Sequence, residues 1–69
     1  MAATSEIIGS NVKRLRVARK MNQSDLAERA GISKAGLQKI ETGRVEPRTG
    51  NLMRIAAALE VDIWRLVEE

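Results

Sequence analysis

Aliphatic side chains recur every three or four residues along most of this chain, in short runs separated by capping residues, glycines and a single proline. This spacing is the period of an amphipathic α-helix. The chain has 69 residues, no cysteine and one aromatic residue, Trp64, so aliphatic packing between helices must supply the core. We therefore expect an all-α fold, a compact bundle of five helices forming one domain over residues 1–69.

The first helix is expected to start after Thr4 or Ser5 and to run to about residue 20. Its buried stripe is predicted at helical spacing and consists of Ile8, Val12, Leu15 and Ala18. Its other faces carry the basic residues Lys13, Arg14, Arg16, Arg19 and Lys20. Such a face is either ordinary solvated surface or a surface whose charge an anion balances.

The second helix is expected over about residues 23–30. Asn22 is a good N-cap residue, and Asp25 places a negative charge in the first turn, where it suits the free backbone N–H groups. Gly31 follows and is the best candidate for a left-handed residue, because it has no Cβ to resist that conformation. The chain is predicted to turn there.

Three further helical segments are expected after that turn. Ser33 would cap a third helix over about residues 34–42. Residues 44–48 are polar, include the only proline and are predicted to form a loop. A fourth helix is expected over about residues 50–59, and Asp62 would cap a last short helix. The side chains expected to face the core from these segments are Leu37, Ile40, Leu52, Ile55, Ala56, Leu59, Ile63, Leu66 and Val67.

The net charge of +3 is distributed unevenly along the chain. Residues 1–48 carry ten Lys and Arg against five Asp and Glu, which gives +5, whereas residues 49–69 carry two against four, which gives −2. A polyanion would be attracted to the first part, and nucleic acid is the obvious candidate. The alternative is a solvated basic surface that has no partner.

The residue types that most catalysis and metal binding require are absent. The sequence has no His, Cys or Tyr, and it shows no Gly-rich phosphate loop, zinc spacing or calcium loop. We therefore expect no enzymatic activity, no cofactor and no metal. No apolar stretch reaches the roughly 20 residues that span a bilayer, and no signal-peptide pattern is present, so we expect a soluble, cytoplasmic protein.

A constellation within residues 23–42 fits two short helices joined by a tight turn. It places a small residue at the helix crossing, a glycine in the turn and apolar residues that fix the second helix. Its members are Gln23, Ala27, Gly31, Ile32, Leu37 and Ile40. This spacing resembles the helix-turn-helix of the lambdoid phage repressor and Cro family.

The resemblance extends over roughly residues 8–67. The segments that carry it are Ile8-Gly9 with Val12, Leu15 and Arg16, then Asn22-Gln23-Ser24-Asp25-Leu26-Ala27, Ile40-Glu41-Thr42-Gly43, and Ile55-Ala56-Ala57-Ala58-Leu59-Glu60-Val61. It implies a λ-repressor-like fold and a sequence-specific, double-stranded DNA-binding transcriptional regulator of the repressor, Cro-like or controller type.

Three positions depart from the family's pattern. Glu60 replaces the usual glycine, so a left-handed turn there would be strained by roughly 1 kcal/mol. Gly36 lies inside the third helix at a cost of about 1 kcal/mol relative to Ala, and it is either simply tolerated or lets the backbone approach DNA closely. Trp64 stands where relatives tend to carry a polar residue.

The resemblance also implies roles for individual residues. The implied contacts to base edges in the major groove are Lys34, Ala35, Gln38 and Lys39. The implied phosphate contacts are Asn22, Gln23, Ser33, Thr42, Arg44 and Arg48. Arg16 and Glu41 are implied to form a largely buried salt bridge.

Relatives in this family bind two-fold operators as dimers, so a homodimer on operator DNA is implied. The candidates for the contact are Val61, Ile63 and Trp64, although Trp64 could instead fold against its own last helix. Two other hypotheses about the function of this chain remain. One is a protein-interaction module such as an antitoxin, which can share the fold, and the other is the N-terminal domain of a longer regulator.

Overall fold

The computed structural model describes residues 4–69, and within that range it contains four α-helices, one 3₁₀ turn and no strand. The elements are α1 (Ser5–Ala18), α2 (Gln23–Ala30), α3 (Lys34–Glu41), α4 (Thr49–Leu59) and η1 (Ile63–Leu66). The all-α prediction is confirmed, whereas the prediction of five helices is wrong.

The predicted fifth helix is the 3₁₀ turn η1. Its backbone bonds span three residues, as in Arg65 N–H to Asp62 O at 2.9 Å. The Asp62 side chain makes no cap bond and instead accepts from the indole N–H of Trp64 at 3.3 Å. The carbonyl oxygens of Leu66 and Glu68 accept from the Asn11 amide rather than from a further helical turn, and the segment ends as a four-residue 3₁₀ turn.

The predicted caps of the two central helices are confirmed. Asn22 and Asp25 form a capping box at the start of α2, in which each side chain accepts from the other residue's backbone N–H. Gly31 ends α2 in the left-handed region at φ 71°. The Ser33 hydroxyl oxygen accepts from Gly36 N–H at 2.9 Å and starts α3.

The first helix ends two residues before the predicted residue 20. Lys20 adopts a left-handed φ of 57°, and the turn brings Met21 into the core. The prediction that Ala18 is buried is wrong, because Ala18 is exposed and Arg16 is the buried residue that follows Leu15. Glu60, at the end of α4, has the same left-handed φ of 57°, as its place in the family's turn predicts.

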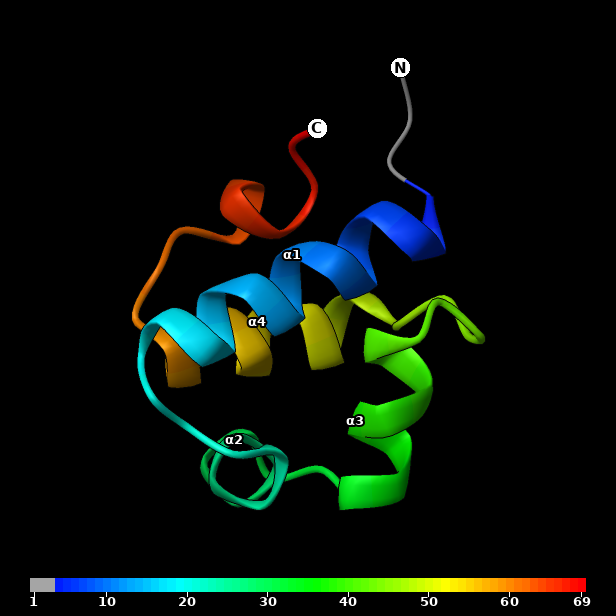
Figure 1. The fold of residues 1–69 in the computed structure, drawn as a ribbon. Helices are drawn as coiled ribbons and strands as arrows, with labels where there is room; N and C mark the ends of the chain where they lie inside the picture. Colours follow the sequence, from blue (N-terminus) through cyan, green and yellow to red (C-terminus); the bar gives the residue numbers. More distant parts are fainter. Residues whose placement is uncertain (1–3) are drawn as a thin grey trace.

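The helices enclose one buried cluster of side chains (Figure 1). Helix α1 lies across α3, α4 and η1, while α2 packs against α3 and α4. The fully buried large side chains come from every one of these elements and are Val12, Leu26, Leu37, Ile55, Leu59 and Leu66. Leu52 packs against this cluster while remaining partly exposed.

The last segment contributes less to the core than predicted. Leu66 is fully buried, but Ile63 is 39% exposed and Val67 is 37% exposed, so the inward orientation predicted for those two side chains is wrong. A buried amide that the sequence analysis missed also holds this segment. The Asn11 side chain donates from α1 to the carbonyl oxygens of Leu66, at 3.0 Å, and Glu68, at 2.7 Å.

At Gly9 the helix α1 lies directly against the backbone of α3. A Cβ added at Gly9 would overlap the carbonyl oxygen of Ile40 and lie 2.9 Å from that of Glu41. Only glycine therefore allows α1 to meet the carbonyl-terminal end of α3 backbone to backbone. Across residues 4–69, none of the helices is long and apolar enough to cross a bilayer.

Candidate nucleic-acid interface

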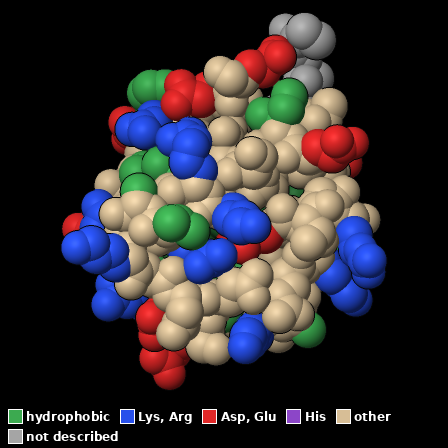
Figure 2. Space-filling model, viewed as in Figure 1, with side chains coloured by type: hydrophobic (Ala, Val, Ile, Leu, Met, Phe, Trp, Pro, Cys, Tyr) green, Lys and Arg blue, Asp and Glu red, His purple; other side chains and the backbone are tan. Residues whose placement is uncertain are grey.

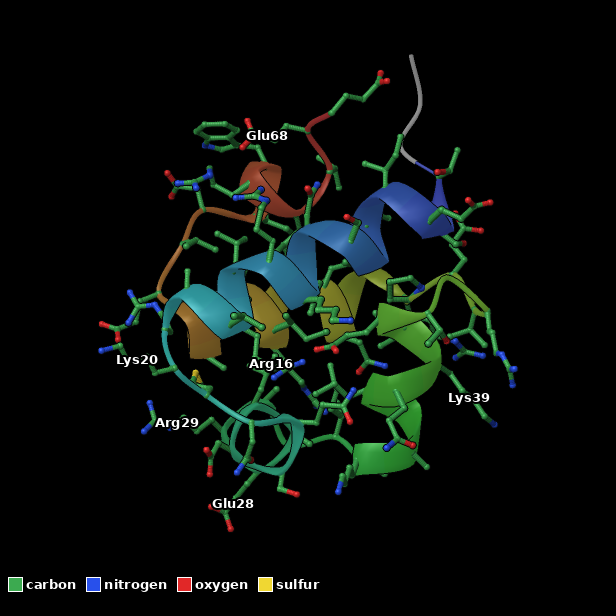
Figure 3. All side chains as sticks on the ribbon, in the orientation of Figure 1. Arg16, Lys20, Glu28, Arg29, Lys39 and Glu68 are labelled. Atoms are coloured by element: carbon green, nitrogen blue, oxygen red, sulfur yellow. The ribbon has the colours of Figure 1, made fainter. Side chains whose placement is uncertain are left out.

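Helix α3 separates its side chains cleanly into two faces. Leu37, Ile40 and Glu41 are buried against the rest of the molecule. The four predicted base contacts, Lys34, Ala35, Gln38 and Lys39, are all exposed. In Figure 3 the Lys39 side chain points from α3 into solvent, away from the helical body. The exposed face is therefore available to a partner along the length of α3.

A groove of about 440 Å³ lies along this face. It is lined by Gln23, Ala35, Gln38, Lys39, Thr42 and Arg44, which come from α2, α3 and the loop after α3. Six of the ten predicted DNA contacts thus meet in one place. The other four, Asn22, Ser33, Lys34 and Arg48, are exposed but do not line the groove.

Three of the predicted phosphate contacts are hydroxyl or amide side chains that also stabilise helix ends. Asn22 and Ser33 act as N-caps, so their oxygens already accept from backbone N–H groups of α2 and α3. The Asn22 NH₂ group and the Ser33 O–H group take no part in these cap bonds, so both can donate to an anion. The hydroxyl of Thr42 differs, because it lies 2.9 Å from Gln38 O and donates back into α3.

Gly36 lies next to the hydroxyl group that caps α3. A Cβ added there would lie 2.9 Å from the Ser33 hydroxyl oxygen, the atom that caps α3. The backbone N–H of Gly36 is itself the donor of that cap bond. A side chain at this position would therefore require the Ser33 hydroxyl to shift, although Asp25 occupies the equivalent position of α2 beside the Asn22 cap.

The charge on this side of the molecule is basic. Lys34, Lys39, Arg44 and Arg48 are exposed on α3 and the loop that follows it. Figure 2 shows Lys and Arg side chains gathered at the edge where α3 lies in Figure 1, and a second set over α1. These positive charges would attract a polyanion to the groove.

An ion pair fixes the carbonyl-terminal end of α3 to α1. Arg16 Nε lies 2.7 Å from Glu41 Oε2, and Arg16 Nη2 lies 3.1 Å from Glu41 Oε1. The two side chains are only 10% and 2% exposed. Arg16 also donates from Nη1 to the carbonyl oxygen of Met21 at 2.8 Å, which holds the turn between α1 and α2. One guanidinium thus joins three elements.

A chain of amide hydrogen bonds continues from this ion pair to the groove. Gln23 Nε2 donates to Glu41 Oε1 at 3.1 Å, and Gln38 Nε2 donates to Gln23 Oε1 at 3.2 Å. Only a phosphate contact was predicted for Gln23, and this link was not. Its partners lie 18 and 15 positions away, so no local pattern in the sequence indicates it.

The three candidates for a dimer contact are close in the sequence, within residues 61–64, but differ in exposure. Trp64 is 55% exposed, and its ring lies under the Arg65 guanidinium at 5.9 Å. Ile63 is exposed to a lesser degree. Val61 is half-buried and packs against the core.

Two short helices, a glycine turn and an exposed second helix define a protein of the helix-turn-helix class. A comparison with family profiles agrees, because the profile described as "Helix-turn-helix" matches residues 12–63. The chain belongs to the helix-turn-helix family.

Similar proteins include bacterial and phage regulators. The chain is 36% identical over 62 residues to the immunity repressor protein of Bacillus phage phi105, covering 90% of this chain and 43% of the repressor. It is 33% identical over 64 residues to the HTH-type transcriptional regulator SinR of Bacillus subtilis, covering 91% of this chain and 58% of SinR. The chain therefore spans about half the length of these relatives.

Solved structures show the same fold. The crystal structure of SinR, described as the master regulator for biofilm formation, in complex with DNA has a TM-score of 0.84 and 32% identity, covering 88% of this chain and 98% of that one. The restriction-modification controller protein C.AhdI from Aeromonas hydrophila has a TM-score of 0.88 at 24% identity, covering 90% and 94% of the two chains. That second likeness concerns the fold alone.

Proposed function

We propose that this chain is a sequence-specific, double-stranded DNA-binding domain of a transcriptional regulator, and that it reads the major groove with α3. The observation that carries the proposal is the exposed, basic face of α3 above a groove lined by polar side chains from α2 and α3. A helix fits the major groove of B-DNA, and residues near its start reach base edges there. The SinR complex with DNA and the name of the phage repressor support the same conclusion. Such a regulator would act in the cytoplasm.

The exposed residues of α3 have chemistry suited to base recognition. Lys34 and Lys39 can donate to guanine O6 and N7, and the Gln38 amide can pair with the adenine edge. Ala35, between them on the groove wall, can contact a thymine methyl group. None of these side chains has to leave the core to do so, because all four are already exposed.

The phosphate contacts would surround this reading face. Arg44 and Arg48 are exposed cations on the loop after α3, where they can reach the DNA backbone. Asn22 and Ser33 lie at the N-termini of α2 and α3, where free backbone N–H groups favour an anion. We assign Gln23 to the same set, with its backbone N–H as the donor. Thr42 would join this set by turning its hydroxyl from Gln38 O to the phosphate.

A homodimer on DNA is also proposed, with Trp64 and Ile63 as its exposed contacts and the half-buried Val61 as a third. An exposed Trp that follows an exposed Ile in the sequence is a suitable anchor for a symmetric contact. Sedimentation of the wild type beside Trp64→Ala, with and without operator DNA, tests this. We expect the dimer to be lost in the variant, and a wild type that stays monomeric on DNA would exclude it.

Selection of bound duplexes from random DNA at a stated salt concentration tests the main proposal. We expect an enriched site, whose binding by the wild type weakens steeply as salt is raised. Lys34→Ala should relax the preference at one base position, which distinguishes base reading from attraction to the phosphates. Failure to retard any duplex in dilute buffer would overturn the proposal.

A further inference from the structure

We propose that Gln23 is a positioning residue that orients the Gln38 amide, and that this orientation makes Gln38 favour adenine over guanine at its base position. The proposal rests on the proposed function, because it concerns how α3 reads a base edge. Its basis is the unbroken chain of hydrogen bonds from the Arg16–Glu41 ion pair through Gln23 to Gln38.

The buried end of this series of hydrogen bonds determines which group donates and which accepts at each step. The Glu41 side chain is only 2% exposed, and both of its carboxylate oxygens accept hydrogen bonds from the Arg16 guanidinium. These oxygens can accept a further hydrogen bond but have no hydrogen to donate. The end of the Gln23 amide that faces Glu41 Oε1, at 3.1 Å, must therefore be the NH₂ group. Figure 3 shows Arg16 reaching from α1 into the space between α1, α2 and α3, where this chain begins.

The same constraint passes on to Gln38. Because the Gln23 NH₂ group faces Glu41, the Gln23 oxygen faces the groove and can only accept. The Gln38 amide must then turn its NH₂ group toward Gln23, and the observed distance from Gln38 Nε2 to Gln23 Oε1 is 3.2 Å. One of the two Gln38 N–H groups is thus engaged, which leaves one N–H and the oxygen for DNA.

One donor and one acceptor match adenine better than guanine. Adenine presents an acceptor at N7 and a donor at the N6 amino group, so Gln38 can pair with both while its bond to Gln23 stays intact. Guanine presents two acceptors, O6 and N7, and satisfying both requires both N–H groups of Gln38. Binding guanine in that way breaks the bond to Gln23, which costs about the worth of one hydrogen bond, or roughly two- to tenfold in affinity.

Gln23→Met tests this, because methionine has a similar length and offers no amide to either partner. The measurement is the affinity for two duplexes that differ only by adenine or guanine at the position that Gln38→Met renders indifferent, at one salt concentration. We expect the wild type to prefer adenine, and we expect this preference to fall about two- to tenfold in Gln23→Met. Gln23→Ala is a second variant with the same expectation, and thermal unfolding by circular dichroism checks that both fold.

Two controls separate positioning from other roles. In the Gln38→Met background, adding Gln23→Met should leave the adenine-to-guanine ratio unchanged, since the oriented amide is already gone. Arg44→Ala should weaken both duplexes equally. If Gln23→Met also weakens both duplexes equally, Gln23 acts as a phosphate contact or a structural residue, and the positioning role is overturned. A wild type that binds neither duplex would instead overturn the proposed function itself.

Discussion

Replacement of Arg16 by Met should remove a large part of the stability of this fold. The Arg16 guanidinium gives Glu41 two hydrogen bonds and Met21 a third. Without it, a carboxylate that is 2% exposed keeps only the Gln23 amide as a partner. An unpaired buried charge of this kind costs about 3 to 5 kcal/mol, whereas a chain of 69 residues has a free energy of unfolding of about 3 to 10 kcal/mol.

Urea unfolding followed by circular dichroism measures this loss. With a slope near 1 kcal/mol per molar urea, typical of a small domain, Arg16→Met should lower the midpoint by about 3 M or leave the chain unfolded in buffer. The matched control is the double variant Arg16→Met, Glu41→Met, which removes both charges and fills the space with apolar atoms. It should recover most of the lost stability, because replacing a whole buried pair is often close to neutral.

Two results would refute this reasoning. An Arg16→Met midpoint within about 0.5 M of the wild type would mean that the ion pair contributes little, as exposed pairs do. A double variant no more stable than Arg16→Met would mean that the loss comes from packing of the Arg16 side chain or from the Met21 carbonyl, rather than from the charge stranded on Glu41.

Three further changes have expected outcomes that follow from the backbone and the surface. Gly9→Ala should lower the free energy of unfolding by about 1 to 3 kcal/mol in urea, because the new Cβ would overlap the Ile40 carbonyl oxygen; wild-type stability would show that α1 can move aside at no cost. Lys20→Gly should raise the free energy of unfolding in urea by about 1 kcal/mol, because Lys20 is exposed and has a left-handed φ of 57°; an unchanged free energy would show that the turn is unstrained. Arg44→Ala should weaken binding to all duplexes alike and reduce the salt dependence by about one unit; a change confined to one sequence would make Arg44 a base contact.

Local chemistry made most of the helix boundaries predictable. Asn22 and Ser33 form cap bonds, and Gly31 forms a left-handed turn, with partners only three or four residues away. The effects of these residues can therefore be inferred from the neighbouring sequence. The end of α1 could not be inferred in that way. Lys20 is left-handed without being a glycine, because the placement of Met21 in the core determines the turn.

The sequence indicated which side chains of the candidate site would be exposed, but not the hydrogen bonds that connect them. Helical periodicity together with the family resemblance indicated which side of α3 would be exposed, and the four residues predicted to read bases are exposed. The contacts of Gln23 depend on how steeply α2 and α3 cross, which is a property of packing across 15 and 18 positions. The 3₁₀ turn at the chain's end depends in the same way on Asn11, whose amide binds carbonyl oxygens 55 and 57 positions away.

The contact at Gly9 has a consequence for how this domain can acquire new DNA preferences. Backbone atoms of α1 and α3 touch there with no side chain between them, so no rotamer change can absorb a tilt or slide of α3 at that end. The C-terminal end of α3, the helix proposed to read DNA, is therefore fixed against α1. Variants that prefer other operator sequences should therefore differ in the outward side chains of α3, while the angle of α3 to the duplex stays the same.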